Sequence, residues 1–331
     1  MRAGLGIRML NRIRAFLDGL CVLPVLAVLT AGIGMLALPD TKYGQFLIQF
    51  LSPAWVISAL LLTVALAGRF RVSLVMATLS TVILSVCLYP QWIPGQDRHG
   101  HEQQGSTARP AAPVFRVVFA NNWFWNKTPE RIGDWIAAEQ PDLVVLAETN
   151  NLDLNTIRRI GRGAYPIIEN YKEFWILSRH PIRTAYTRTP GDGHPGGMAL
   201  WDFDLLAGEH TYRIVAIHTT RPWPFTKEYA QTDQKDYATR IINRRNNRHT
   251  VLIGDFNAVP RTPVMQAYAR ETGLRLTPVT LGTWPTALPG ALRLGIDNAL
   301  YSQGFILVDR KVGPHTGSDH RPIRLDLYPA T

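Results

Sequence analysis

The first third of the chain is dominated by long apolar runs that carry no charge. Each run is long enough to cross the hydrocarbon core of a bilayer, which needs about 20 residues in a helix. The pattern predicts a membrane region over residues 1–95. The three transmembrane helices are expected at about residues 18–38, 45–67 and 72–92. A cleaved signal peptide would explain the first run alone, but not the two runs that follow it.

Positive charges between the apolar runs predict how the helices are oriented. Four arginines and no acid precede Phe16, two arginines lie in the turn Arg69–Arg71, and one lysine lies in the loop Asp40–Tyr43. Because Lys and Arg concentrate on the cytoplasmic side, we expect the N-terminus and the Arg69–Arg71 turn there. Three crossings then place everything after Pro94 outside the cytoplasm. The sequence therefore predicts a multi-pass protein of the inner or plasma membrane, with the lipid bilayer as a partner.

The composition changes after the third apolar run. Residues 96–113 are polar and rich in Gly, Pro and Gln, which is typical of a flexible linker. Residues 114–331 contain short apolar runs of strand type and three amphipathic segments of helix type, the latter at 129–139, 227–243 and 263–270. Strands and helices mix without strict alternation. This favours an α/β fold with packed sheets rather than a single doubly wound sheet.

Polar side chains stand at or near the ends of several predicted strands. They are Asn121, Glu148, His218, Asp255, Asn257, Asp297, Asp319 and His320. Each has an ordinary structural interpretation when it is taken alone: Asp255 and Asn257 could form an Asx turn, and His218 could be a hydrogen-bonded core histidine. Taken together they indicate a functional site, because α/β sheets build their sites at strand ends.

The segment Gly254–Asn257 carries the most chemical information. Residues two apart on an extended chain point the same way, so Asp255 and Asn257 are expected at one rim. A carboxylate there can orient or deprotonate a water, and an amide can hold a phosphoryl oxygen. Asp319 and His320 add a second acid beside an imidazole. Pairs of this kind suit metal-assisted hydrolysis.

Cysteine content and charge narrow the chemistry further. Cys21 and Cys87 both lie in apolar runs, which excludes a cysteine nucleophile or a cysteine zinc site in residues 114–331. The whole chain carries a formal charge of +10, and the part from Arg98 onward holds 28 Lys and Arg against 22 Asp and Glu. Such a balance favours an anionic partner, but it does not separate nucleic acid from phospholipid headgroups.

Four segments, in the same order along the chain as in the family, make residues 114–331 resemble the endonuclease/exonuclease/phosphatase superfamily. They are Pro141–Glu148, Gly254–Asn257, Gly295–Asn298 and Gly317–Pro322, and the resemblance runs from about residue 115 to 328. That family includes deoxyribonucleases of the pancreatic type, abasic-site endonucleases, neutral sphingomyelinases and inositol phosphatases. The resemblance is greatest to small bacterial members attached to membranes. It implies a two-sheet α/β sandwich that hydrolyses phosphate esters.

The resemblance also implies a metal site. Glu148 would bind a divalent cation, expected to be Mg²⁺ with Mn²⁺ as the alternative, and Asn121 and Asp319 would assist. Oxygen ligands of this kind suit a hard cation. Asn121 would in addition contact the phosphate of the substrate.

Catalytic roles follow from the same resemblance. Asp255 would orient or deprotonate the attacking water, while Asn257 and His218 would contact the scissile phosphate. His320 would stabilise the transition state or protonate the leaving group. Asp297 would hold the ring of His320 in its working tautomer, which is a common task of a carboxylate behind an imidazole.

Three positions depart from the family pattern. Many nucleases of the family place an acid or an amide two residues after the strand-end asparagine, where this chain has Trp123. We therefore expect one metal ion rather than two. Ala147 replaces the glutamine that usually precedes the metal-binding glutamate, and Asn298 replaces a histidine. These two differences lower the match to nucleases but leave the core chemistry in place.

The sequence predicts a membrane-anchored, metal-dependent phosphodiesterase or phosphomonoesterase. Its substrate would be an anionic phosphate ester, either nucleic acid or a phospholipid headgroup, outside the cytoplasm. The alternatives are a catalytically inactive anion-binding domain and a scaffold on a membrane anchor. Aromatic residues in the segments Asn122–Trp125 and Pro222–Phe225 could stack on a base, touch lipid or pack internally. No protein partner can be inferred.

Overall fold

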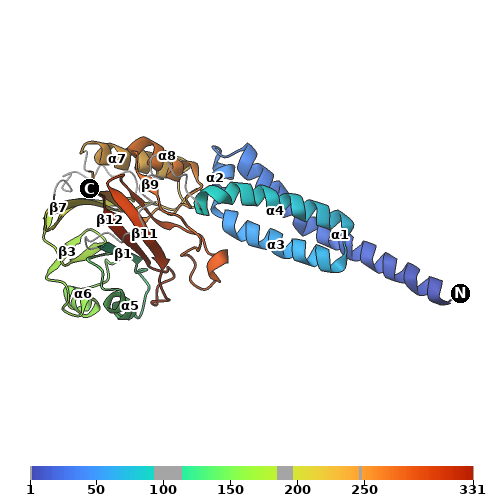
Figure 1. Ribbon diagram of the computed structural model, residues 1–331, viewed down its shortest axis with the longest axis horizontal. Coiled ribbons are helices and arrows are strands. Elements are labelled where there is room, and N and C mark those ends of the chain that lie inside the picture. Colours follow the sequence, from blue (N-terminus) through green and yellow to red (C-terminus); the bar gives the residue numbers. More distant parts are fainter. Residues whose placement is uncertain (1, 93–113, 185–196, 246–247, 331) are drawn as a thin grey trace. The chain divides into compact units, whose positions relative to one another are not determined.

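The computed structural model describes residues 2–92, 114–184, 197–245 and 248–330 (Figure 1). The chain forms two compact units, Met1–Pro90 and Gln91–Thr331, which we call the N-terminal unit and the C-terminal unit. The segment predicted as a linker, residues 96–113, lies outside the described residues. Each unit has its own packed interior, and the candidate chemistry belongs to the C-terminal unit.

The N-terminal unit consists of helices. They are α1 (Arg2–Ala37), α2 (Lys42–Gln49), α3 (Leu51–Gly68) and α4 (Arg71–Trp92). Three stretches are long and apolar enough to cross a membrane, namely Met9–Ala37, Leu51–Gly68 and Arg71–Trp92. Figure 1 shows α1, α3 and α4 running side by side.

The second predicted span differs from the observed helices. The sequence suggested one helix over about residues 45–67, whereas the structure has α2 and α3 with a break at Phe50. Pro53 explains the break, because a proline ring clashes with the carbonyl four residues earlier, which here is that of Gln49. Pro53 therefore sits in the first turn of α3, where its missing N–H does no harm.

Polar contacts fix the packing inside the N-terminal unit. Asp18 of α1 accepts hydrogen bonds from the backbone N–H groups of Val72 at 3.2 Å and Ser73 at 3.0 Å, at the start of α4. These are donors that no residue within the helix can satisfy. The Trp55 indole donates to Ser85 Oγ at 2.8 Å and joins α3 to α4. Asp18, near the middle of α1, consequently lies beside the beginning of α4.

The C-terminal unit contains two six-stranded sheets, and parallel and antiparallel pairs occur in both. The first sheet has the order β11-β12-β1-β2-β4-β3, and the second has the order β5-β6-β7-β8-β10-β9. The first sheet is built from β1 (Phe115–Asn121), β2 (Leu143–Ala147), β3 (Ile167–Tyr171), β4 (Phe174–Ser178), β11 (Phe305–Val312) and β12 (Ile323–Pro329). The second is built from β5 (Ile182–Thr184), β6 (Ala199–Ala207), β7 (His210–His218), β8 (Thr250–Asp255), β9 (Arg275–Leu276) and β10 (Asp297–Tyr301).

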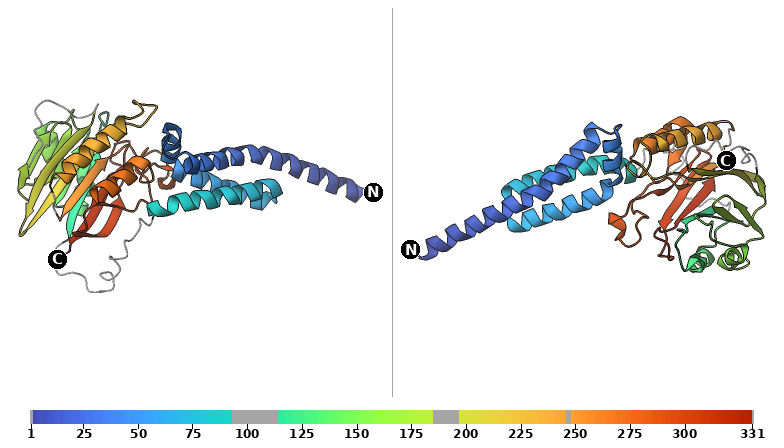
Figure 2. Two further views of the ribbon diagram at one scale, coloured as in Figure 1. Left: turned by 90° about the horizontal axis from the view of Figure 1, so that it is seen from above. Right: turned by 180° about the vertical axis from the view of Figure 1, so that it is seen from behind.

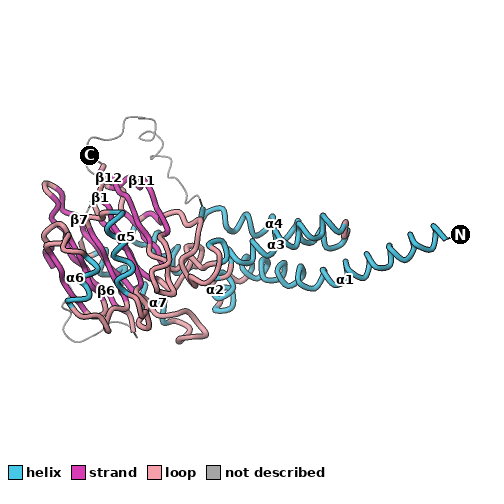
Figure 3. Tube along the Cα trace, turned by 90° about the horizontal axis from the view of Figure 1, so that it is seen from below, coloured by secondary structure: helices cyan, strands magenta, loops and turns pink. Residues whose placement is uncertain are grey.

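Three buried clusters define four layers in this unit. The largest cluster lies between the two sheets and includes Phe119, Val145 and Ile253, none of which has measurable exposure. A second cluster packs the other face of the second sheet against α7 (Ala230–Asn243) and α8 (Pro263–Thr272). A third packs the first sheet against α5 (Ile132–Glu139) and α6 (Leu154–Gly161). Figure 2 shows these layers and Figure 3 shows the strands running side by side. The predicted two-sheet α/β sandwich is confirmed.

Two helices begin later than the sequence suggested. The segment predicted as a helix from residue 129 starts with a 3₁₀ turn, Pro129–Arg131, before α5 begins at Ile132. The segment predicted from residue 227 becomes helical only at Ala230. In both cases the preceding residues form part of a loop that follows a site strand, β1 or β7.

Parallel pairing in each sheet brings strand ends together. β1 and β2 are parallel neighbours, with Asn121 opposite Ala147, and β7 and β8 are parallel neighbours, with His218 opposite Asp255. β10 runs antiparallel to β8, so its first residue, Asp297, also lies opposite Asp255. The polar residues at these ends are therefore placed at a common edge of the sandwich.

Candidate active site

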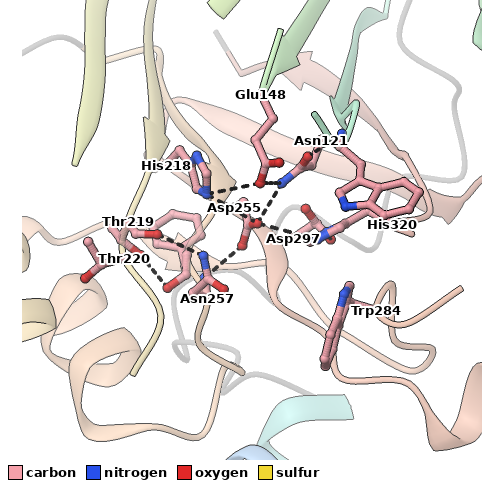
Figure 4. A network of polar contacts seen from close by, with 12 residues as sticks. Asn121, Glu148, His218, Thr219, Thr220, Asp255, Asn257, Trp284, Asp297 and His320 are labelled. Carbon is pink, nitrogen blue, oxygen red and sulfur yellow. Dashed lines mark hydrogen bonds and ion pairs between the residues drawn. The ribbon is translucent and has the colours of Figure 1, made fainter. Parts of the chain in front are cut away.

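Three strands of the second sheet place one row of titratable side chains. His218 ends β7, Asp255 ends β8 and Asp297 begins β10, and the strand register puts all three side by side. Asn121 reaches this row from the first sheet, where its side-chain N–H₂ donates to Asp255 Oδ2 at 3.0 Å. Figure 4 shows the resulting network. The site thus joins the two sheets at the edge where their strands end.

Glu148 completes the cluster from the turn after β2. Its backbone adopts φ 54°, a left-handed conformation that is uncommon for a residue other than glycine. Asn121 donates a second hydrogen bond to Glu148 Oε1 at 2.8 Å, and the backbone N–H of Phe124 donates to Glu148 Oε2 at 3.3 Å. Such an unfavourable backbone conformation persists only where its surroundings hold it, and here it keeps a carboxylate against the cluster.

Asp255 lies at the centre of the network and is buried. Its Oδ1 accepts the backbone N–H of Asn257 at 2.8 Å, while its Oδ2 faces Asn121 and both histidines. Burial raises the pKa of Asp255 to about 6, and the charge of Asp297 acts in the same direction. A carboxylate with a pKa near neutrality is well suited to accept a proton from water.

His320 and Asp297 form a buried pair. His320 Nδ1 lies 2.9 Å from Asp297 Oδ2, and His320 Nε2 lies 3.8 Å from Asp255 Oδ2. Burial alone would lower the pKa of His320, but the charge of Asp297 and the hydrogen bond to it outweigh burial and raise this pKa to about 10. Asp297 therefore orients the ring so that Nε2 faces the cluster.

His218 has a similar arrangement with a partner that the sequence did not suggest. His218 Nδ1 lies 2.6 Å from Glu173 Oε1, and its Nε2 lies 3.7 Å from both Glu148 Oε1 and Asp255 Oδ2. Burial would lower the pKa of His218, but the hydrogen bond to Glu173 and the charge of Asp255 raise it to about 9. Two protonated imidazoles consequently flank Asp255 at neutral pH.

Asn257 is held by the backbone beside it. Its side-chain N–H₂ donates to the carbonyl of Thr219 at 2.8 Å, and its own carbonyl accepts a hydrogen bond from Gln231 Nε2 at 3.1 Å. Its backbone has φ 46°, which asparagine tolerates better than most residues. The side chain is thereby placed next to Asp255 (Figure 4). The sequence argument assumed an extended chain, whereas β8 ends at Asp255 and the left-handed turn places Asn257.

Asp319 precedes His320 in the chain, and its carboxylate contacts a tryptophan. Trp284 Nε1 donates to Asp319 Oδ2 at 2.9 Å, and Asp319 Oδ1 lies 3.9 Å from His320 Nε2. Within the described residues, this Oδ1 is buried and accepts no hydrogen bond. The backbone of Asp319 also accepts the N–H of Thr286, so the loop that carries Trp284 is fixed to the Asp319–His320 segment. The sequence pattern gave no indication of Trp284.

Two groups of side chains in the described residues could hold a metal ion. One consists of Glu148, His218 and Asp255, and the other of Asp255, Asp297 and His320, each with its ligand atoms within 4.8 Å of one another. Of the two acids predicted to bind metal, Glu148 belongs to such a group of His, Asp and Glu side chains and Asp319 does not. Asn121 donates hydrogen bonds from its N–H₂ to Glu148 and Asp255. Asp319 accepts a hydrogen bond from the indole of Trp284.

The charges of the cluster fit a divalent cation. Five carboxylates lie in or beside it, and they outnumber the two imidazoles even when both rings are protonated: Glu148, Glu173, Asp255, Asp297 and Asp319. An anionic substrate would be repelled by this excess, and a bound cation would remove the repulsion. Carboxylate oxygens are also the ligands that Mg²⁺ and Mn²⁺ prefer.

Two of the three departures from the family pattern have structural explanations, and nothing in the structure explains the side chain of Trp123. Ala147 is buried in β2 opposite Asn121, where a larger side chain would meet the core. Asn298 is buried and donates to the carbonyls of Gly295 and Ala258, so it fixes the backbone before β10. Trp123 has φ 60°, and its N–H donates to Asn121 Oδ1 at 2.8 Å.

Comparison with known proteins agrees with this architecture. The Endonuclease/Exonuclease/phosphatase family model matches residues 115–320. A solved endonuclease/exonuclease/phosphatase from Beutenbergia cavernae DSM 12333 is 19% identical with a TM-score of 0.50, covering 66% of this chain and 72% of that protein. A family protein from Bacteroides thetaiotaomicron is 14% identical with a TM-score of 0.51, covering 65% and 97%. None of the curated proteins matches the chain.

Proposed function

Because the chain belongs to the endonuclease/exonuclease/phosphatase family, we propose that it is a metal-dependent phosphodiesterase on a membrane anchor. Its substrate would be a phosphodiester of nucleic acid or of a phospholipid headgroup, outside the cytoplasm. The observation that carries this proposal is the position of Asp255, buried between two imidazoles and hydrogen-bonded to an amide from the opposite sheet. This complete set of groups argues against an inactive anion-binding domain or a scaffold.

Glu148 is the main candidate to hold the metal ion. Its carboxylate lies within reach of Asp255 and His218, while Asn121 and Asp319 stand close enough to the cluster to assist. A bound divalent cation would neutralise charge and polarise the phosphoryl group of a substrate. An amide binds a cation through its oxygen, so Asn121 would bind the ion directly only with its amide reversed from the observed orientation, in which its N–H₂ donates to Glu148 and Asp255.

Asp255 is the proposed base. Its Oδ1 accepts the N–H of Asn257, and its Oδ2 accepts one hydrogen bond from Asn121. The second lone pair of Oδ2 would orient a water and accept a proton from it. The amide of Asn257 and Nε2 of His218 lie next to this carboxylate and would donate hydrogen bonds to phosphoryl oxygens. Contacts that strengthen as negative charge develops on these oxygens lower the barrier to hydrolysis.

His320 is the proposed acid. Its Nε2 faces the cluster, and because the neighbouring Asp297 raises the pKa of His320 to about 10, both ring nitrogens carry a proton at neutral pH. Nε2–H can therefore donate its proton to the leaving oxygen or bind the developing charge. Asp297 does not touch the substrate in this proposal and acts by orienting the ring. The arrangement provides a base and an acid on two sides of a phosphate.

Substrate preference tests the proposal directly. The purified full-length protein in detergent micelles should be offered a DNA oligonucleotide, an RNA oligonucleotide, phosphatidylglycerol and 4-nitrophenyl phosphate with Mg²⁺. We expect a diester to be hydrolysed faster than the monoester, because several donors surround the space beside Asp255. If nucleic acid is the substrate, binding should weaken steeply with salt as counterions are released. Exclusive cleavage of the monoester would contradict the diester proposal.

The membrane topology supplies a further expected result. We propose that the helices in Met9–Ala37, Leu51–Gly68 and Arg71–Trp92 cross the membrane with the N-terminus in the cytoplasm. The contact between Asp18 and the start of α4 supports a common side for the N-terminal arginines and the Arg69–Arg71 turn. A reporter enzyme that works only outside the cytoplasm should be active after Thr331 and inactive within Arg69–Arg71. The opposite pattern would contradict the topology and an extracytoplasmic substrate.

A further inference from the structure

Four exposed aromatic side chains stand in the loops beside the candidate site. We call Phe124, Trp125, Phe225 and Tyr229 the aromatic rim; they are 44%, 68%, 66% and 68% exposed. The first two follow β1, and the last two lie between β7 and α7. Internal packing therefore does not account for these residues. Exposed aromatics that gather in neighbouring loops mark an interaction surface more often than scattered ones do.

The first loop of the rim is attached to the site itself. The backbone N–H of Phe124 donates to Glu148 Oε2, and its carbonyl accepts a hydrogen bond from Asn151 Nδ2 at 2.8 Å. The N–H of Asn126 donates to the carbonyl of Trp123 at 2.9 Å, which closes the turn that presents Trp125. These contacts hold Trp125 outward, one residue after the Phe124 N–H that donates to the carboxylate proposed to bind metal.

The second loop is attached on the other side of Asp255. Asn257 binds the carbonyl of Thr219, where this loop begins, and Figure 4 shows Thr219 and Asn121 on opposite sides of Asp255. The N–H of Phe225 donates to the carbonyl of Pro222 at 2.9 Å, and Thr226 Oγ donates to that of Arg221 at 2.5 Å. The exposure of Phe225 is thus fixed by a closed turn.

Basic residues accompany the aromatic ones in both loops. Lys127 follows Trp125 by two positions, Lys227 follows Phe225 by two positions, and Arg221 stands before it, all three exposed. Aromatic rings combined with Lys and Arg are favoured at the headgroup level of a membrane, where rings meet the apolar boundary and cations meet phosphates. We propose that the aromatic rim docks on the headgroup region of the bilayer and that the substrate is a phosphate ester of a membrane lipid. The assignment of a lipid substrate rests on the proposed function.

Two observations favour lipid over nucleic acid. Three apolar helices in the same chain would keep the C-terminal unit at a bilayer, which raises the effective concentration of lipid headgroups at its site. A single-strand nucleic-acid surface stacks successive bases on aromatic faces along a basic groove. The rings of Phe124 and Trp125 instead meet edge to face at 88°, and the second pair of aromatics belongs to a separate loop.

Docking can be tested without measuring catalysis. The full-length protein with Cys21→Ser and Cys87→Ser would carry a fluorophore at Trp125→Cys, in vesicles of phosphatidylcholine and phosphatidylglycerol that contain nitroxide-labelled lipid. We expect quenching at position 125 and none at Val308→Cys, a matched site in β11 that is 57% exposed. Equal fluorescence at both positions would overturn docking, whatever the enzyme activity.

The assignment of a lipid substrate is tested by comparing turnover of a lipid diester with turnover of a soluble diester. In the same vesicles, turnover of phosphatidylglycerol relative to soluble bis(4-nitrophenyl) phosphate should fall about tenfold in Trp125→Ala/Phe225→Ala, because the apolar contact with the interface is lost. Val308→Ala should leave the ratio unchanged. An unchanged ratio in the double variant would overturn the proposal. It would also be overturned if the wild-type protein cleaved an oligonucleotide faster than phosphatidylglycerol and the double variant lost that cleavage. If the wild-type protein hydrolyses neither diester, the proposed function itself fails, while quenching still decides docking.

Discussion

Replacement of Asp255 by asparagine, or of His320 by alanine, is expected to lower kcat for a phosphodiester by about 10²-fold or more. The amide introduced by Asp255→Asn would keep the shape of the carboxylate and an acceptor for the N–H of Asn257, but it could not take a proton. Removal of the His320 imidazole would delete the donor that faces Asp255. Initial rates at saturating Mg²⁺ and substrate are the measurement.

A matched control separates chemistry from folding in this experiment. His315→Ala makes the same change five residues before His320, at an exposed position outside the network. We expect it to retain wild-type turnover. His320→Ala leaves Asp297 buried without its partner, so thermal unfolding should be recorded for every variant. Near-wild-type turnover in both Asp255→Asn and His320→Ala would contradict the assignment of base and acid.

Replacement of Glu148 by glutamine is expected to weaken metal binding by at least the roughly 10- to 100-fold that is typical when a hydrogen-bonding partner of a metal ligand is removed. The neutral side chain would keep its size and could still accept the N–H of Phe124, but it would remove the charge that attracts the cation. The Mg²⁺ concentration that gives half-maximal activity should rise accordingly, and part of the activity should return at high Mg²⁺. Calorimetric titration of Mg²⁺ or Mn²⁺ measures the affinity directly.

Glu130→Gln supplies the control for this metal titration. Glu130 is exposed, pairs with Arg159 and lies outside the cluster, so the same loss of one carboxylate should leave affinity unchanged. Unaltered affinity in Glu148→Gln would show that the ion is held elsewhere. Two ions bound with comparable affinity by the wild-type protein would contradict the single ion expected from Trp123.

The sequence predicted the architecture because its strongest signals were local. Apolar runs of strand length, such as the one that ends at Asp255, identify buried strands, and polar residues at their ends identify the edge of a sandwich. The same reasoning placed Asn121, His218 and Asp297 at one site. Short edge strands such as β5 and β9 were missed, since their pairing partners rather than their own composition make them strands.

The missed site residues share a physical reason. Glu173 lies in the turn between β3 and β4, and only the packing of the two sheets brings it to His218, 45 positions away. Trp284 meets Asp319 through a loop of irregular structure. Trp284 has no periodic pattern or strand end beside it, so pattern analysis had no signal to use. Glu173 directly precedes β4, but nothing in the local pattern of this turn residue indicates an imidazole as its partner. The direction in which the Asn121 amide points is likewise set by its neighbours, not by its position in the strand.

The most direct test of the central claim, that the cluster around Asp255 is a metal-dependent phosphoesterase centre, is one continuous assay. The full-length protein would be given bis(4-nitrophenyl) phosphate with Mg²⁺, then excess chelator, then an excess of Mg²⁺. The account predicts hydrolysis that stops on chelation and resumes when Mg²⁺ is restored, because Glu148 and its neighbours require a cation to offset their charge. Full activity in the presence of chelator, or no hydrolysis with Mg²⁺ present, would contradict it.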